Sequence, residues 1–250
     1  MGGGGFTAGA GDPALDELVL RLTGLPRPRL CLLPTAGGDS EHQIRRFYET
    51  YGDRLCEPSH ISLFRLGRRP VPLREHLLAQ DAIYVGGGSM VNLLAIWRAQ
   101  GLHEILGEAW RNGVVLAGLS AGSMCWFQWG VTTSSGAAAP VPGLGFLPGS
   151  NSVHHDSEPA RRPVYVQAVR RGELPPGWAV DDGAALIFKG THLAEVVSAR
   201  EHARAYAVTP SCVRALPARL LLGSVAARAT MPAVAELRRL RLARSGGLRD

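Results

Sequence analysis

A serine within a G-x-S-x-G motif is the strongest chemical signal in the sequence. Ser120 lies in Gly118-Leu-Ser-Ala-Gly122, directly after an apolar run at residues 114–119 that has the length of a strand. Residues 121–128 contain no proline and can begin a helix. In such a nucleophile elbow the serine hydroxyl is exposed at the edge of a sheet, and the amide of the next residue, Ala121, can stabilise an oxyanion. The motif therefore predicts a serine nucleophile.

A run of three glycines at residues 86–88 predicts the second oxyanion donor. The run directly follows a strand-like segment at residues 82–85. Consecutive glycines permit backbone conformations that turn N–H groups toward a ligand. We expect Gly88 to donate to the oxyanion, and Gly87 to be the nearest alternative and a substrate contact. A nucleotide phosphate loop is disfavoured because Gly-Lys-Ser is missing and the glycine spacing does not match the dinucleotide fingerprint.

A serine nucleophile needs a base within hydrogen-bond reach, and histidine is the side chain whose ordinary pKa suits neutral pH. Eight histidines are present. Six of them lie in segments typical of structural or exposed residues. His154 and His155 instead lie in a polar loop beside Asp156. Residue chemistry alone leaves the base role open between these two histidines.

The order of the predicted elements indicates one α/β domain. The predicted strands are residues 30–33, 60–66, 82–85 and 114–119, and the predicted helices are residues 16–22, 40–51 and 73–79. Alternation of strands and helices is typical of a mostly parallel sheet with helices on both faces. Later in the chain, residues 184–188, 193–197 and 204–208 are predicted to form strands at an antiparallel edge of the sheet.

The chain divides into three parts by composition. Residues 1–13 are rich in glycine and are predicted to be a flexible leader with no part in the fold. Residues 14–214 are predicted to form the single α/β domain. Residues 215–250 form a basic extension, in which residues 225–243 have a helical pattern and are a candidate for a homodimer contact or for binding an acidic partner.

Composition and charge disfavour several other classes of protein. The formal net charge is +6, but the basic residues are scattered and almost all are arginine, so we expect no nucleic-acid partner. No apolar run approaches the roughly 20 residues that span a bilayer, so we expect a cytoplasmic protein that has no membrane partner. The four cysteines are widely spaced without a C-x-x-C motif, and no metal or organic cofactor is predicted.

Several motifs occur together in an order that resembles a known family. They are Gly86-Gly-Gly-Ser, Gly118-Leu-Ser-Ala-Gly-Ser, Gly143-Leu-Gly-Phe-Leu-Pro-Gly and His154-His-Asp. With these motifs the sequence resembles the peptidase E family of serine peptidases, which includes aspartyl dipeptidases and cyanophycinases. The resemblance implies a flavodoxin-like fold, also described as class I glutamine amidotransferase-like.

The resemblance also implies a role for particular residues. Ser120 would be the nucleophile and His154 the general base, while His155 stands where the family commonly has an aromatic residue. Gly88 and Ala121 would form the oxyanion hole. The implied substrate is a short peptide, with aspartate as a candidate residue in it, and the implied reaction passes through an acyl-enzyme. Two arginines that follow the histidine, Arg161 and Arg162, are expected to bind substrate carboxylates.

One departure from the family concerns the acid that orients the histidine. Many members have an aspartate in the segment after the elbow, where this sequence reads Thr132-Thr-Ser134. Thr133 could hold the imidazole instead, or a later acid could do so. The later acids are Asp156, Glu158, Asp181 and Asp182. A weakly active or inactive relative that binds a small acidic ligand is the alternative function. An ordinary α/β-type esterase is disfavoured, because no acid lies between Ser120 and His154.

Overall fold

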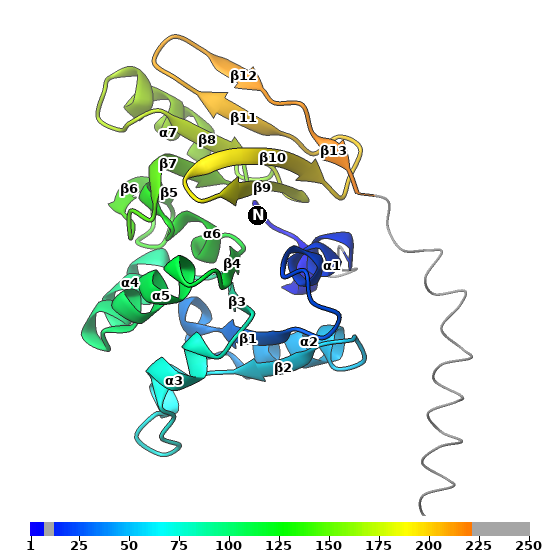
Figure 1. Ribbon diagram of the computed structural model, residues 1–250. Coiled ribbons are helices and arrows are strands. Elements are labelled where there is room, and N and C mark those ends of the chain that lie inside the picture. The colour runs from blue at the N-terminus through cyan, green and yellow to red at the C-terminus, as the bar shows by residue number, and fades with distance from the viewer. Residues whose placement is uncertain (8–12, 222–250) are drawn as a thin grey trace, which may run out of the picture.

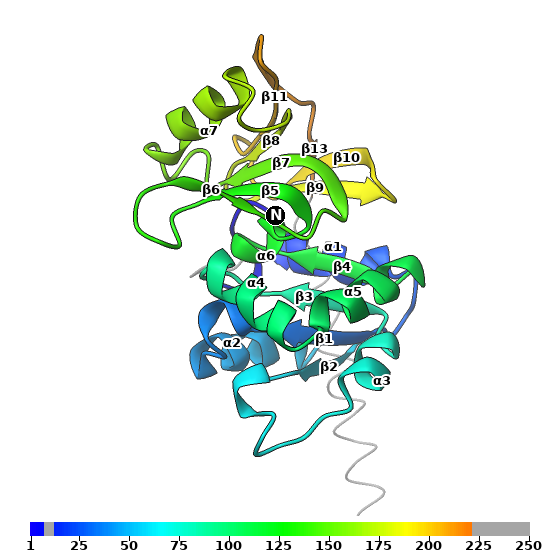
Figure 2. The same ribbon diagram turned by 90° about the vertical axis from the view of Figure 1, so that its left-hand side faces the viewer.

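The computed structural model describes residues 1–7 and 13–221, in which helices pack around three β-sheets (Figures 1 and 2). The α-helices are α1 (Pro13–Leu22), α2 (Glu41–Tyr51), α3 (Leu73–Leu78), α4 (Met90–Ala99), α5 (Leu102–Arg111), α6 (Ala121–Met124) and α7 (Arg161–Arg170). The strands are β1 (Arg29–Leu33), β2 (Glu57–His60), β3 (Ala82–Val85), β4 (Val115–Gly118), β5 (Phe127–Thr132), β6 (Ala139–Pro142), β7 (Leu147–Val153), β8 (Gly177–Val180), β9 (Ala184–Lys189), β10 (His192–Ser198), β11 (Ala205–Val208), β12 (Val213–Ala215) and β13 (Arg219–Leu220).

A four-stranded parallel sheet in the order β2-β1-β3-β4 carries the elbow at the end of β4. Alternate residues of β1 face opposite sides of this sheet. Leu30 and Leu32 pack with residues of α1 and α2 in one apolar cluster. Cys31 and Leu33 pack with residues of α3, α4 and α5 in another. The sheet is therefore covered by helices on both faces, as predicted.

A six-stranded sheet in the order β12-β11-β8-β7-β5-β6 carries the segment that contains His154. Its central strands β5, β7 and β8 are parallel, while β6, β11 and β12 add antiparallel edges. Helix α7 packs on one face, where Tyr165 and Val169 are fully buried. The third sheet, in the order β13-β10-β9, pairs β9 with β10 antiparallel. The predicted α/β class with mainly parallel sheets is confirmed. Of the three strands predicted at an antiparallel edge, only β11 lies on the antiparallel side of the six-stranded sheet, whereas β9 and β10 pair antiparallel in the separate third sheet.

Two predicted elements differ from the structure. The strand predicted at residues 60–66 lies earlier in the chain, as β2, and ends at His60. It ends there because the backbone N–H of Phe64 donates to Asp39 and a short 3₁₀ turn forms at Leu63–Arg65. The helix predicted at residues 121–128 ends at Met124, and the chain enters β5 at Phe127. The aromatic and β-branched residues of β5 suit the sheet better than a longer helix.

The predicted flexible leader is wrong for residues 1–7. Phe6 is 1% exposed and lies edge-on to Phe47 and Tyr84, with ring centroids 5.7 and 5.2 Å away. Its backbone N–H donates to the buried carboxylate of Asp16. One buried aromatic side chain can hold a glycine-rich segment in place, because aromatic rings bury a large apolar area.

At the other end of the domain, the described fold passes the predicted boundary at residue 214. Strand β12 runs through residue 215, and β13 pairs in parallel with β10. The helix predicted at residues 225–243 lies outside the described residues.

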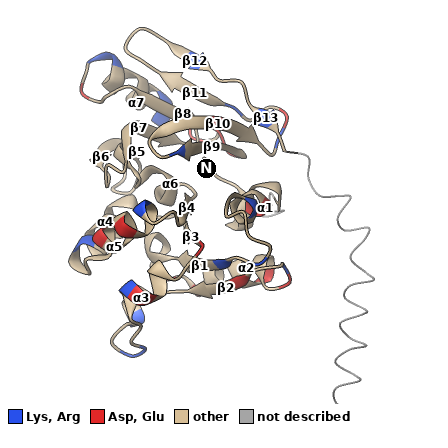
Figure 3. Cartoon of the chain, viewed as in Figure 1, with Lys and Arg blue, Asp and Glu red and all other residues tan. Residues whose placement is uncertain are grey.

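Charged side chains are dispersed over the described part of the chain. In the view of Figure 3, the stretches coloured for lysine and arginine and those coloured for aspartate and glutamate are spread over several helices and loops. Within residues 1–7 and 13–221, no helix combines the length and the apolar character needed to cross a membrane.

The buried pair of Tyr51 and Asp16 provides a test of this packing. The Tyr51 hydroxyl donates to the carboxylate of Asp16 at 2.9 Å, and both residues are at most 1% exposed. We predict that Tyr51→Phe lowers the free energy of unfolding by about 1–3 kcal/mol, because a buried carboxylate loses a donor. Tyr48→Phe, at an exposed tyrosine of the same helix, should change it by less than about 0.5 kcal/mol. Equal denaturant midpoints for the two variants would contradict this prediction.

Candidate active site

Ser120 occupies a strained turn between β4 and α6. Its backbone angles are φ 54° and ψ −119°, in a region that non-glycine residues rarely adopt. The flanking glycines permit the close approach that this turn requires. A Cβ atom on Gly118 would lie 2.0 Å from the carbonyl oxygen of Gly122, and one on Gly122 would lie 2.3 Å from that of Val85. The predicted strand, turn and helix of the elbow are therefore present, with a shorter helix than expected.

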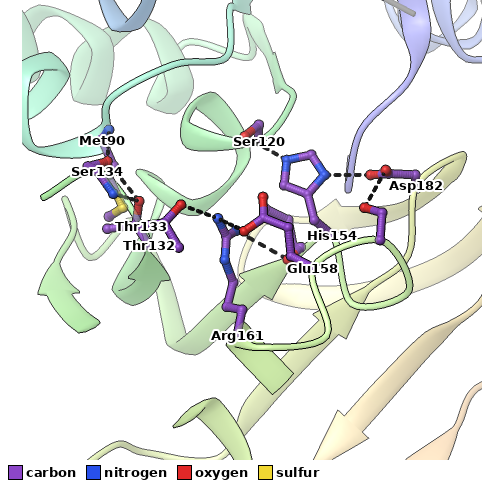
Figure 4. A network of polar contacts seen from close by, with 11 residues as sticks. Met90, Ser120, Thr132, Thr133, Ser134, His154, Glu158, Arg161 and Asp182 are labelled. Carbon is purple, nitrogen blue, oxygen red and sulfur yellow. Dashed lines mark hydrogen bonds and ion pairs between the residues drawn. The ribbon is translucent and has the colours of Figure 1, made fainter. Parts of the chain in front are cut away.

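The side chains of Ser120, His154 and Asp182 form a continuous hydrogen-bonded chain (Figure 4). Nε2 of His154 lies 2.9 Å from Oγ of Ser120, and Nδ1 lies 2.6 Å from Oδ1 of Asp182. An ionised carboxylate can only accept, so Nδ1 carries the proton and Nε2 can accept the serine proton. Of the two histidines left open by the sequence, the structure places His154 beside the serine.

Among the four later acids, Asp182 is the one that contacts the imidazole. Asp156 accepts a hydrogen bond from the backbone N–H of Asp182 and so holds the loop that carries it. Asp181 is 3% exposed and accepts from the backbone N–H of Arg204. Successive residues thus point to opposite sides of the chain, Asp181 into the fold and Asp182 toward His154.

Hydrogen bonding keeps the Asp182 carboxyl ionised. Burial by itself would raise its pKa, but hydrogen bonds from His154 and from the Ser157 hydroxyl, at 2.7 Å, outweigh burial, and the net pKa is lowered. The two carboxylate oxygens therefore have separate donors, His154 for Oδ1 and Ser157 for Oδ2. This arrangement fixes the carboxylate plane relative to the imidazole ring.

The Arg161 side chain contacts the loop that carries His154 and is directed away from Ser120 (Figure 4). Its side chain is 4% exposed and pairs with Glu158 at 2.8 Å. It also donates to the Thr133 hydroxyl and to the carbonyl oxygen of Val153, the residue before His154. Thr133 is therefore occupied by the guanidinium and does not contact the imidazole in its place.

A cavity of about 390 Å³ opens over the candidate nucleophile. Its lining residues are Gly3, Gly4, Thr7, Gln43, Gly87, Leu119, Ser120, His154, Asp182 and Arg200. Neither arginine expected to bind substrate is among them. For Arg161 the prediction is corrected by its burial and internal pairing, while Arg162 is exposed and lines a separate cavity on α7.

Most of the other lining residues were missed from the sequence. Gln43 and Arg200 belong to no recognisable motif, and the N-terminal glycines resemble a linker. Near Gln43 the sequence offers one signal, the Ser40 cap, which predicts the start of a helix. In the structure this helix, α2, begins beside the cavity.

The glycine run lies against the candidate nucleophile. A Cβ atom on Gly87 would lie 3.2 Å from Cβ of Ser120. The Gly87 carbonyl oxygen accepts from Nε2 of Gln43 at 3.4 Å, and in a trans peptide the N–H of Gly88 points the opposite way. Among the described residues, the N–H groups of Gly88 and Ala121 have no hydrogen-bond acceptor. Both amides are therefore available for an oxyanion.

His155, next to His154 in the chain, is a buried aromatic ring. It is 4% exposed, its ring centroid lies 4.9 Å from that of Tyr206, and neither ring nitrogen has a hydrogen-bond partner among the described residues. Burial, followed by the nearby Arg162 cation, lowers the pKa of His155 from 6.5 to about 4. Asp156 opposes this shift without cancelling it.

Within residues 1–7 and 13–221, no group of three or more histidine, cysteine or acidic side chains is arranged to hold a metal ion.

The lowered pKa of His155 predicts a loss of stability in mild acid. Between pH 6.5 and about 4 the unfolded chain binds a proton at this histidine that the folded chain does not, so stability falls as the pH falls through that window. Between pH 7.5 and 5 the loss is on the order of 2 kcal/mol. His155→Phe should remove this part of the pH dependence, as measured by denaturation at both pH values.

His192→Phe, at an exposed histidine, is the matched control and should keep the pH dependence of the unsubstituted protein. If His155→Phe and His192→Phe lose stability equally on acidification, His155 is not the group responsible.

Comparison with known proteins identifies the family. The model of peptidase family S51 matches residues 1–196. A protein of Bacillus subtilis (strain 168) named "Uncharacterized peptidase YgaJ" is 47% identical over 208 residues, which are 83% of this chain and 90% of that protein. The crystal structure of a peptidase from an acI-B1 Actinobacterium superposes with a TM-score of 0.68 at 20% identity, covering 87% of this chain and 92% of the other, and so shares its fold. The chain belongs to peptidase family S51, the peptidase E family of serine peptidases.

Proposed function

We propose that this protein hydrolyses short peptides through an acyl-enzyme formed on Ser120. The observation that carries the proposal is the continuous chain of hydrogen bonds from Ser120 through His154 to Asp182. A nucleophile, a base and an acid that orients the base are the three parts that acyl transfer by serine requires.

In the proposed mechanism, Nε2 of His154 takes the Ser120 proton as Oγ attacks the peptide carbonyl carbon. The imidazolium then gives this proton to the leaving amine, the carbon–nitrogen bond breaks, and the acyl group stays on Oγ. Water attacks the ester with His154 again as base, which releases the acid and regenerates the serine. Asp182 stays ionised throughout and stabilises the imidazolium at Nδ1.

The amides of Gly88 and Ala121 are the proposed oxyanion hole, with Gly87 as the alternative in the glycine run. Support comes from the absence of acceptors for the Gly88 and Ala121 N–H groups among the described residues and from the contact of Gly87 with Ser120. In this arrangement Gln43 positions the Gly87–Gly88 peptide. Loss of one such donor typically costs a hundredfold or more in kcat.

A short peptide, with aspartate as a candidate residue, is the proposed substrate class. The cavity of about 390 Å³ suits a short peptide better than a long, extended one. Arg200 lines it, and a guanidinium there favours a substrate carboxylate. The alternative is an inactive relative that binds a small acidic ligand. The hydrogen bond between Asp182 and Nδ1 of His154 supports the peptidase over this alternative.

The proposed nucleophile and substrate class can be tested together. We expect the protein to hydrolyse one or more members of a panel of Asp-Xaa dipeptides and matched neutral Xaa-Xaa dipeptides. Ser120→Ala should lower kcat by roughly a millionfold, to background. A serine-reactive fluorophosphonate should label the unsubstituted protein and leave Ser120→Ala unlabelled. Turnover that survives Ser120→Ala would refute the acyl-enzyme, and a preference for neutral dipeptides would refute the aspartate specificity.

A second prediction separates the two candidates for the group that orients His154. Asp182→Asn should lower kcat by roughly ten-thousandfold, because a neutral amide favours the wrong imidazole tautomer and does not stabilise the imidazolium. Thr133→Val removes a hydroxyl that contacts Arg161 and should lower kcat by less than about tenfold. Equal losses in the two variants, with melting temperatures unchanged, would contradict the assignment of Asp182.

A further inference from the structure

The segment before α1 forms one wall of the active-site cavity. Gly3, Gly4 and Thr7 line this cavity together with Ser120 and His154. In Figure 1 the N-terminus lies between the sheet that ends in β4 and the pair β9 and β10. The glycine-rich segment is therefore in contact with the proposed catalytic residues.

Backbone hydrogen bonds of Gly2 and Gly3 connect the serine turn to the loop of the acid. The carbonyl oxygen of Gly2 accepts from the N–H of Ser120 at 3.2 Å, and the N–H of Gly2 donates to Ala184 at 3.1 Å. The carbonyl oxygen of Gly3 accepts from the N–H of Gly183 at 3.0 Å, and Gly3 pairs with Asp182 as an isolated parallel bridge. Two consecutive residues thus contact Ser120 on one side and the residues around Asp182 on the other.

Gly3 leaves no room for a side chain beside the proposed catalytic pair. A Cβ atom there would lie 2.3 Å from Oδ1 of Asp182 and 3.0 Å from Cε1 of His154. That oxygen is the one that accepts from His154. Gly3 does not have a positive φ, so the requirement for glycine comes from contact with the carboxylate and not from backbone conformation.

We infer that Gly3 is a positioning residue for the His154–Asp182 pair, and that its backbone holds the Asp182 carboxylate at hydrogen-bond distance from the imidazole. The inference builds on the proposed function, because it assigns Gly3 an effect on catalysis. Gly3 itself touches no reacting atom in the proposed mechanism.

The test is a double-mutant cycle between Gly3 and Asp182. Gly3→Ala should lower kcat by about a hundredfold with KM changed less than about threefold, because a small misplacement of a catalytic group has an effect of that size. In an Asp182→Ala background the same substitution should change kcat by less than about tenfold, since the clashing oxygen is gone and only the 3.0 Å approach to Cε1 of His154 remains. Gly67→Ala, at an exposed glycine with open space around it, is the matched control and should leave kcat unchanged.

A spectroscopic readout distinguishes failure of this inference from failure of the proposed function. The proton shared by Nδ1 of His154 and Asp182 should give a far-downfield NMR resonance that does not depend on any substrate. We expect Gly3→Ala to shift or abolish this resonance, and Gly67→Ala to preserve it. If the protein hydrolyses no peptide but the resonance responds to Gly3→Ala, the positioning role stands without the peptidase activity.

Several outcomes would overturn the positioning role. One is a folded Gly3→Ala variant with unchanged resonance and unchanged kcat. Another is an equal loss of kcat from Gly3→Ala with and without the Asp182 side chain. Where Gly3→Ala alone fails to fold, a folded double variant with Asp182→Ala supports direct contact with the carboxylate, and an unfolded double variant refutes it.

Discussion

The hydrogen bond between Ser120 and His154 joins two different sheets, and the rest of the site depends on keeping these side chains 2.9 Å apart. Ser120 follows β4 in the four-stranded sheet, whereas His154 follows β7 in the six-stranded sheet. No local turn can set this distance, so it depends on how the sheets pack. One apolar cluster contains Val85 from the first sheet and Val153 from the second, together with Met124 of α6. Core packing in this region therefore controls the distance between Ser120 and His154, because close-packed interiors transmit small displacements.

Among the described residues, three non-glycine residues have a positive φ, and two of them are Ser120 and His154; the third is Asp39. Ser120 and His154 both have positive φ, 54° and 57°, which costs about 1–3 kcal/mol for each residue. At Ser120 the flanking glycines let the neighbouring backbone approach closely enough to hold the turn. At His154 the carbonyl oxygen accepts from the N–H of Glu158 at 2.8 Å, and Glu158 in turn pairs with Arg161. The buried arginine thus supports the active site by stabilising a strained loop, which explains why it lies near the base without facing the substrate cavity.

Local signals in the sequence were sufficient for strands β1, β3, β4, β9, β10 and β11, for helices α1, α2 and α3, and for the elbow. Strand β2 was misplaced, and no strand was predicted at β5, β6 or β7. The G-x-S-x-G motif, the glycine run after β3 and the Ser40 cap each predict a structure from neighbouring residues alone. The N-terminal segment could not be predicted in this way, because its order depends on contacts of Phe6 with residues more than 40 positions away. The early end of α6 was missed for a related reason. Helix propensity extends past Met124, but pairing of Phe127 with Leu147 in the sheet outweighs it.

The acid could not be chosen from the sequence because its position follows from strand pairing. Strands β7 and β8 are parallel neighbours with Val153 opposite Val180, so the residues that follow them lie side by side at one edge of the sheet. His154 is the first residue after β7. Asp181 and Asp182 follow β8 and point to opposite sides, which leaves only Asp182 directed at the imidazole. The order serine, histidine, acid differs from the order in α/β-hydrolases, but the geometry of the three groups is what acyl transfer requires. Once the pairing of β7 with β8 is known, the acid can be identified by alternation along the chain, without reference to any motif.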